Sequence, residues 1–199
     1  MHWREHGFDA LIWLMAGLLT AALLWIVGDM VRQGFEHLSW AFLTTEPEHA
    51  GRAGGIAPIL VSTVLILLVA LVVAVPLGLA TAIWLAEFAR QGGRFAYTVR
   101  ISLDVLAGVP SIVYGLFGNA FFAVFLGLGL SIAAGGLTLA CMILPVFIRT
   151  CEVGLTAIPH DWRRGALALG MRRSAAIWWI VLPAAAPAMI AGLMLGMGR

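Results

Sequence analysis

Apolar residues occupy four long segments of the chain that contain no Asp, Glu, Lys or Arg. These segments cover residues 10–28, 56–86, 105–148 and 174–198. A helix that crosses a bilayer needs about 20 predominantly apolar residues, because each residue adds about 1.5 Å to its length. The first, second and fourth segments therefore predict one spanning helix each. Pro76 lies inside the second helix, where it can bend the helix without ending it.

The third segment is about twice as long as one span requires. Four glycines gather near its middle, Gly127, Gly129, Gly135 and Gly136. They predict an uncharged turn that joins two spans. The whole pattern thus predicts an all-α integral membrane protein, a polytopic helical bundle of five spans.

Composition agrees with this pattern. Hydrophobic residues make up 62% of the chain and charged residues 11%, and the mean hydropathy is +1.00. An ordinary soluble domain has about 25% charged residues, so a soluble fold is excluded. The first segment could instead be the core of a cleaved signal peptide. It is longer than the about 7–15 residues of such a core, and Glu5 and Asp9 balance the charge before it, so we interpret it as a helix.

The distribution of arginine predicts the orientation in the membrane. All twelve residues counted as Lys or Arg are arginine. With the N-terminus in the cytoplasm, nine arginines fall on the cytoplasmic side: Arg4, Arg90, Arg94, Arg100, Arg149, Arg163, Arg164, Arg172 and Arg173. Only Arg32 and Arg52 fall in the outer loop. Because positive residues concentrate on the cytoplasmic side, this topology is favoured. It also places Cys141 and Cys151 on the reducing side, where a structural disulfide is not expected.

The chain lacks the residues that would supply energy for transport. The absence of lysine excludes a Walker-A loop, whose Lys reaches the β and γ phosphates of ATP. The apolar segments contain no Asp, Glu or His that could form a proton relay. His2 and His6 have helical spacing but no third ligand nearby, so a metal site is not expected. Energy for any transport must therefore come from another subunit.

The loop at about 149–179 is the candidate site of that energy input. Residues 162–169 have a composition compatible with a short helix, and Gly170 can adopt the left-handed conformation that ends one. A second short helix is expected at about 174–180. Helices this short need a partner surface. The pattern leaves two functions open, which are docking into a groove of another protein and lying on the membrane surface.

The same loop resembles the EAA loop of the permeases of ABC importers. Gly170 is followed, after nine residues, by Ile180, Val181, Leu182 and Pro183. The resemblance implies that this loop is a coupling helix that inserts into an ATPase subunit. The chain departs from the family where the usual Glu-Ala-Ala stands as Arg164, Gly165 and Ala166. The contact that the acidic residue of this motif makes with the ATPase is therefore expected to be absent or moved to Glu152 or Asp161.

Further stretches resemble the phosphate-specific permeases of this family, in particular the PstA-like subunit. They are Gly-Gly-Ile-Ala-Pro at 54–58, Val-Pro-Leu-Gly at 75–78, Ala-Glu-Phe at 86–88 and Pro-Ser-Ile-Val-Tyr-Gly-Leu-Phe-Gly at 110–118. The resemblance implies the type I importer fold with six spans. Since we count five, we expect residues 1–199 to be a single permease domain that is incomplete at its C-terminus.

The resemblance also implies the partners of the chain. They are a second homologous permease, a dimer of ATP-binding cassette ATPases, an extracytoplasmic phosphate-binding protein and the lipid of a bacterial inner membrane, with no role for nucleic acid. ATP would be used by the ATPase, and this chain would bind no cofactor itself. Two alternatives stay open: a permease for another solute such as sulfate, molybdate or phosphonate, and a membrane scaffold that transports nothing.

Three residues are candidates for the translocation path. Arg199 matches a family arginine in the last span, and Ser111 and Tyr114 offer hydroxyl groups to a passing anion. Polar residues in spans more often bond to a neighbouring helix, and we favour that function for the two hydroxyls. Ala184, Ala188, Gly192 and Gly196 recur at every fourth position. They predict a face of small residues against which another helix packs closely.

Overall fold

The computed structural model describes residues 2–35, 37–48, 53–89 and 93–198. The chain divides into two compact units, Met1–Val61 and Ser62–Arg199. Within the described residues, four helices are long and apolar enough to cross a membrane, namely Leu11–Phe35, Ala57–Phe88, Ile132–Thr156 and Arg173–Met197. A fifth candidate is a bent pair of helices. The predicted all-α polytopic fold is confirmed.

The first unit consists of one long helix and a small hairpin. Helix α1 (His2–Phe35) is followed by α2 (Trp40–Thr44), which begins where the Ser39 Oγ accepts a hydrogen bond from the Phe42 N–H at 3.1 Å. Strands β1 (Pro47–Glu48) and β2 (Ala53–Gly54) pair antiparallel. Within this unit, every side chain of α1 whose burial is described is exposed.

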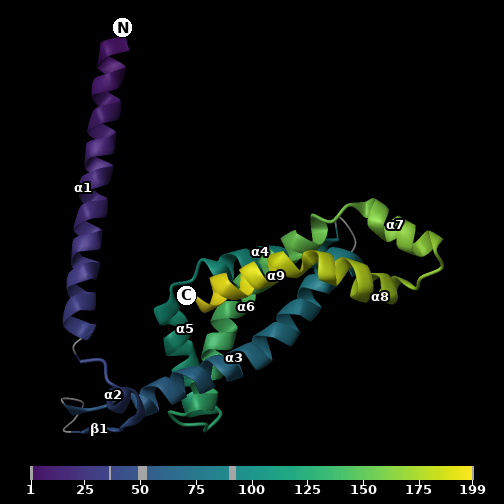
Figure 1. Cartoon of the computed structure of the whole chain (residues 1–199). Helices are drawn as coiled ribbons and strands as arrows, with labels where there is room; N and C mark the ends of the chain where they lie inside the picture. Colours follow the sequence, from purple (N-terminus) through teal and green to yellow (C-terminus); the bar gives the residue numbers. More distant parts are fainter. Residues whose placement is uncertain (1, 36, 49–52, 90–92, 199) are drawn as a thin grey trace. The chain divides into compact units, whose positions relative to one another are not determined.

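The second unit is a bundle of helices (Figure 1). In the described part of the chain, wide π-helical turns extend or interrupt three of these helices. The elements of this unit are α3 (Ala57–Ile83, which begins in the first unit), η2 (Trp84–Phe88), α4 (Arg94–Ala107), α5 (Ser111–Gly118), η3 (Asn119–Phe125), α6 (Ile132–Thr156), α7 (His160–Ala168), α8 (Arg173–Ala176), η4 (Ile177–Val181) and α9 (Leu182–Met197). The core lies between α3, α4, α6 and α9.

Helix α6 is the element against which the others pack. A Cβ placed on Gly78 of α3 would lie 2.5 Å from Cδ1 of Phe147, and one on Gly196 of α9 would lie 2.7 Å from Cγ2 of Ile143. Both partners belong to α6 and are buried. The predicted face of small residues in the last span is thus confirmed as an intrachain contact at Ala188, Gly192 and Gly196, whereas Ala184 is exposed. Small residues allow this approach because no side chain separates the two backbones.

The third apolar segment differs from the expectation at its start. Helices α4 and α5 meet at an angle of 100°, with a break between Ala107 and Ser111. Pro110 causes the break, because it lacks an N–H and disfavours helical geometry in the residue before it. Helix α5 has 8 residues and η3 has 7, which is too short for a span without α4. The count of five spans therefore requires α4, α5 and η3 to form one broken span.

The expected glycine turn is confirmed only in part. Gly127 and Gly129 have φ values of +70° and +62° and form the turn before α6. Gly135 and Gly136 were expected in the same turn, and that expectation is wrong because they lie inside α6. A Cβ on Gly136 would lie 2.5 Å from Cγ1 of Val69 and 3.1 Å from the Ile66 carbonyl oxygen. Gly136 therefore serves close packing on α3.

The loop after α7 also differs from the expectation. The second short helix predicted at about 174–180 is not separate, since Arg173–Met197 is one helix of 25 residues. Pro183 follows the wide turn η4. A π-type turn relieves the clash between a proline ring and the preceding turn, so the helix continues through it. The last span is therefore directly continuous with the candidate coupling loop.

The packing of Gly136 predicts a difference between two adjacent substitutions. Gly136→Ala should destabilise the protein by about 1–3 kcal/mol, because the added methyl meets Val69 and a backbone carbonyl. Gly135→Ala should be neutral or stabilise by up to about 1 kcal/mol, since its methyl would lie 3.6 Å from Ile66, an ordinary contact, and alanine favours a helix. Thermal unfolding in detergent checks both, and equal stability of the two variants would contradict the packing.

Candidate functional site

Helix α7 is a short helix at one end of the second unit (Figure 1). It follows Pro159 and ends in a Schellman motif, in which Gly170 N–H donates to the Leu167 carbonyl at 3.0 Å and Met171 N–H donates to the Ala166 carbonyl at 3.1 Å. Gly170 has a φ of +80°. The predicted helix and its glycine stop are confirmed, with the start two residues earlier than expected.

The two faces of α7 have different surroundings. Ala166 faces the bundle and is 2% exposed, which explains why a small residue is needed there. Arg164 is 81% exposed along its side chain, and Ala168 on the same face is exposed. Gly165 is also exposed, and its Cβ position is open among the described residues. The outer face of α7 is thus a narrow surface with apolar and charged side chains, suited to docking in a groove.

Arg163 holds the inner face of α7 to the ends of two other helices. Its guanidinium pairs with Glu87 of η2, with Nε 2.7 Å and Nη2 2.6 Å from Oε1. Nη1 donates to the Ile158 carbonyl at 2.7 Å, and Nη2 donates to the Leu155 carbonyl at 2.8 Å. The side chains of Arg163 and Glu87 are 17% and 6% exposed. One planar cation therefore joins α7 to the ends of α3 and α6.

A second arginine reaches the same end of α3 from the other side of the loop. Arg173 of α8 donates from Nη2 to the carbonyl oxygen of Glu87. Its guanidinium carbon lies 4.8 Å from the centre of the Phe88 ring, which adds a cation–π contact. The Ala-Glu-Phe stretch that the sequence resemblance identified is therefore bound by both helices of the loop.

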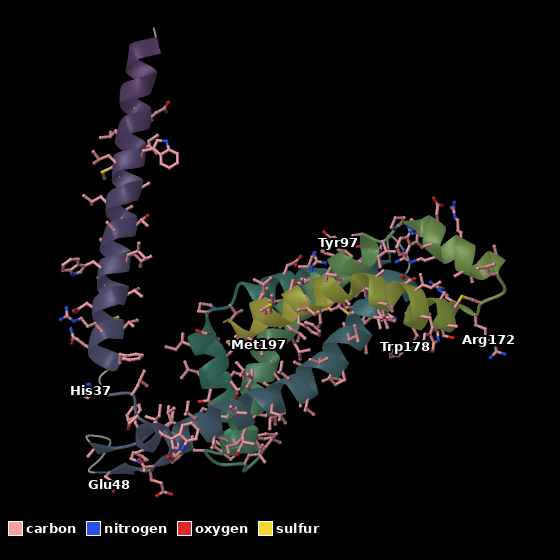
Figure 2. All side chains as sticks on the ribbon, viewed as in Figure 1. His37, Glu48, Tyr97, Arg172, Trp178 and Met197 are labelled. Atoms are coloured by element: carbon pink, nitrogen blue, oxygen red, sulfur yellow. The ribbon has the colours of Figure 1, made fainter. Side chains whose placement is uncertain are left out.

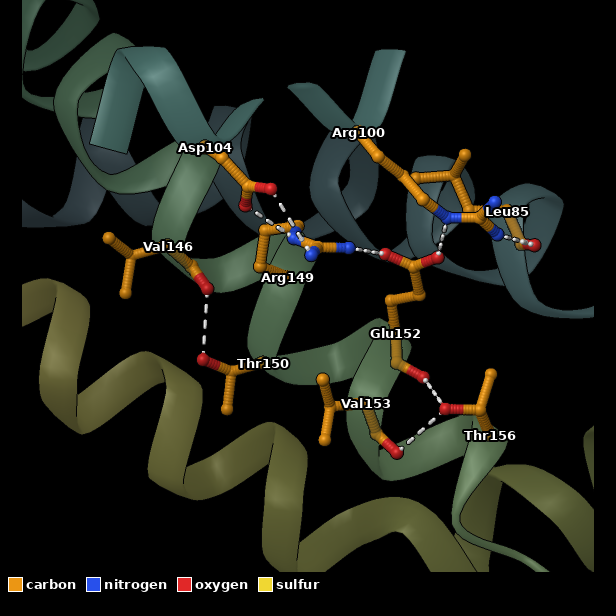
Figure 3. A network of polar contacts seen from close by, with 9 residues as sticks. All are labelled: Leu85, Arg100, Asp104, Val146, Arg149, Thr150, Glu152, Val153 and Thr156. Atoms are coloured by element: carbon orange, nitrogen blue, oxygen red, sulfur yellow. Dashed lines mark hydrogen bonds and ion pairs between the residues drawn. The ribbon is translucent and has the colours of Figure 1, made fainter. Parts of the chain in front are cut away.

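A further charged network joins α4 to α6 (Figure 3). Glu152 accepts from Arg100 Nε and from Arg149 Nη1, each at 2.6 Å, and Arg149 Nε donates to Asp104 Oδ1 at 2.8 Å. Arg100 also donates to the Leu85 carbonyl at 3.1 Å. Sequence reasoning missed this network. The spacing of Arg149 and Glu152, three residues apart on one helix, was a local signal, but nothing local indicated Arg100 or Asp104.

The geometry decides between the two predicted positions for a relocated acid. Glu152 is 4% exposed and neutralised by two arginines, so it is not available to a docking partner. Asp161 lies in the first turn of α7, 88% exposed along its side chain, 3.8 Å from Arg164 Nη1. Asp161 is thus the acidic group that the outer face of α7 presents.

The second half of the EAA-like motif lies in the last helix. Leu182 is buried in the core, Ile180 is half-buried in η4, and Pro183 is exposed in the first turn of α9. Leu182 therefore contributes to the packing of the last helix, which is continuous with α8 and Arg173.

The candidate path residues fall partly at one cavity. Ser111 and Tyr114 line a cavity of about 490 Å³, together with Asn119, Ser131 and Thr138. Tyr114 is 7% exposed, and its hydroxyl donates to the Leu106 carbonyl at 3.0 Å, which agrees with the packing function that we favoured. Arg199 lies outside the described residues.

The chain is similar to several permease proteins. It is 32% identical over 186 residues to the probable ABC transporter permease protein YqgI of Bacillus subtilis, which covers 94% of this chain and 63% of that protein. It is 42% identical over 147 residues to the phosphate transport system permease protein PstA homolog of Mycoplasma pneumoniae, covering 70% of this chain and 22% of that protein. It is 40% identical over 147 residues to the phosphate transport system permease protein PstA 1 of Mycobacterium tuberculosis, covering 74% of this chain and 48% of that protein.

The chain spans less than two thirds of the length of each of these relatives. Residues 74–199, which include α7, both arginine contacts to Glu87 and the buried network of Glu152, match the family described as binding-protein-dependent transport system inner membrane component. The chain therefore belongs to the family of binding-protein-dependent transport system inner membrane components.

Proposed function

We propose that the chain is the membrane-spanning permease subunit of an ATP-driven importer that carries inorganic phosphate across a bacterial inner membrane. The observation that supports this most directly is α7, a helix with an exposed outer face and an inner face tied by Arg163 to the ends of α3 and α6. A helix attached in this way can transmit a displacement of its outer face to the spans.

The energy comes from a separate pair of ATPase subunits that bind α7 on the cytoplasmic side. The chain itself lacks the lysine of a Walker-A loop and binds no nucleotide in that manner. Closure of the ATPases around ATP displaces α7, and the ends of α3, α6 and α8 follow because they share its contacts. Rigid movement of the spans then alternates access to the path.

Phosphate is the proposed substrate because relatives at 40% and 42% identity are named phosphate transport system permease proteins. The Pro-Ser-Ile-Val stretch at 110–113 begins α5 beside the cavity of about 490 Å³. Ser111 and Asn119 at that cavity offer neutral donors to an oxyanion. A second permease pairs with this chain, and an extracytoplasmic binding protein delivers the substrate.

Reconstitution tests the proposal directly. The permease, assembled with the second permease and the ATPase subunits in liposomes and supplied with the binding protein, should take up labelled phosphate only when ATP is present. An excess of sulfate should leave uptake unchanged, while unlabelled phosphate should abolish the signal. Uptake that sulfate abolishes and phosphate does not would contradict the proposed substrate.

The cap of α7 predicts an effect of a single methyl group. Gly170→Ala places a Cβ in the left-handed region, at a cost of about 1–2 kcal/mol, which is roughly tenfold in population. We expect ATP-driven uptake to fall several-fold while the amount of permease in the membrane stays the same. The matched variant Gly17→Ala in α1, where the Cβ position is open, should transport normally. Equal uptake by the two variants would count against α7 as the coupling element.

The orientation predicts which face a membrane-impermeant thiol reagent reaches. Arg172 lies between α7 and α8, and its exposed side chain extends away from the helices (Figure 2). Arg172→Cys should be labelled in inside-out vesicles and protected in right-side-out vesicles. Glu48→Cys, on the exposed strand β1 and labelled in Figure 2, should show the opposite pattern. Labelling of Arg172→Cys from the outside would overturn the cytoplasmic position of α7.

A further inference from the structure

Both the side chain and the backbone carbonyl of Glu87 bind the end of α3 to the candidate coupling loop. Its carboxylate pairs with Arg163 of α7, and its backbone carbonyl accepts from Arg173 of α8. The two arginines lie on opposite sides of the Gly170 turn. Glu87 is therefore the residue at which both helices of the loop meet α3.

Directional polar contacts, in addition to the buried Ala166, position α7 against the bundle. A pocket of about 270 Å³ lies between α7 and the start of the last helix, lined by Glu87, Arg163, Leu167, Arg173, Ala176, Ile177 and Val181. The contacts of Arg163 lie beside this pocket and constrain the position of α7 relative to α3.

Burial distinguishes the Glu87–Arg163 pair from the other ion pair of α7. The side chain of Glu87 is 6% exposed, whereas Arg164 and Asp161 are 81% and 88% exposed and 3.8 Å apart. An exposed pair contributes little, because water competes for both groups. Removing one partner of a buried, hydrogen-bonded pair is strongly unfavourable, because it leaves an uncompensated charge. The buried Glu87–Arg163 pair therefore resists separation of α7 from α3, whereas the exposed Arg164–Asp161 pair contributes little.

We propose that Glu87 is a positioning residue that makes α7 and the C-terminal end of α3 move as one body, so that displacement of α7 is transmitted to α3. This inference rests on the proposed function, since it requires an ATPase that displaces α7. Helix α3 is a suitable receiver of that motion. It packs along α6 through Gly78, and Ile66 on the same helix lines the cavity that also contains Ser111.

The substitution Glu87→Gln tests this role in the assembled transporter. It retains the size of the side chain and removes the charge that holds Arg163. We expect the ATPase to stay bound and ATP hydrolysis to remain near the wild-type rate, while phosphate taken up per ATP hydrolysed falls about tenfold, within the range of known coupling between sites. Glu48→Gln, the same substitution on exposed β1, should keep the wild-type ratio.

A ratio within twofold of wild type for Glu87→Gln would overturn the proposal. The result separates the two hypotheses. If the proposed function is wrong, the wild-type complex itself shows no ATP-driven uptake. If only the role of Glu87 is wrong, wild-type uptake is normal and the variant matches it.

A distance measurement tests the same inference first with Glu87 intact and then with Glu87→Gln. Spin labels are placed by Trp84→Cys in η2, Leu169→Cys beside α7 and Leu130→Cys in the exposed turn before α6, in pairs, with Cys141 and Cys151 replaced by alanine. We expect the 84–169 distance to stay the same between the nucleotide-free and ATP-bound complex while the 130–169 distance changes. Adding Glu87→Gln should broaden the 84–169 distribution. A shift of the 84–169 distance on ATP binding in the presence of Glu87, or a constant 130–169 distance, would overturn the proposal.

Discussion

The close approach of three helices to α6 is the constraint on which the rest of the second unit depends. Lipid is as apolar as the side chains, so burying an apolar surface against another span yields little, and association relies on close packing and polar contacts. Gly78 of α3, Gly118 of α5 and Gly196 of α9 each bring their backbone against a side chain of α6. Because these contacts fix the positions of the helices relative to α6, they also bring Glu87, Arg163 and Arg173 close together.

The spans were predictable from the sequence because charge cannot be buried cheaply in lipid. The apolar segments at 56–86 and 174–198 correspond to helices that extend only a few residues beyond them, to Phe88 and from Arg173. The break at Pro110 was not predicted, since proline inside an apolar run is compatible with both a bent helix and a broken one. Pro76, by contrast, lies within a continuous helix.

Glycine was the least predictable residue type, for a physical reason. Gly127 and Gly136 are nine residues apart in the same apolar segment, yet one has a positive φ and the other lies inside a helix. Sequence records only the absence of a side chain, which serves equally a left-handed turn and a close helix contact. The helix α7 and its stop at Gly170 were predictable because two signals agreed, the glycine and the short helical stretch before it.

The polar contacts of the candidate site could not be predicted from local patterns, because their partners are far apart in the chain. Arg163 and Glu87 are 76 residues apart, and Arg100 and Glu152 are 52 apart. Each carboxylate lies near the end of a span, where an unpaired charge would be costly and a guanidinium from another helix can neutralise it. The apolar middle of the bundle therefore determines which helices are neighbours, and the charges at their ends determine which of those neighbours move together.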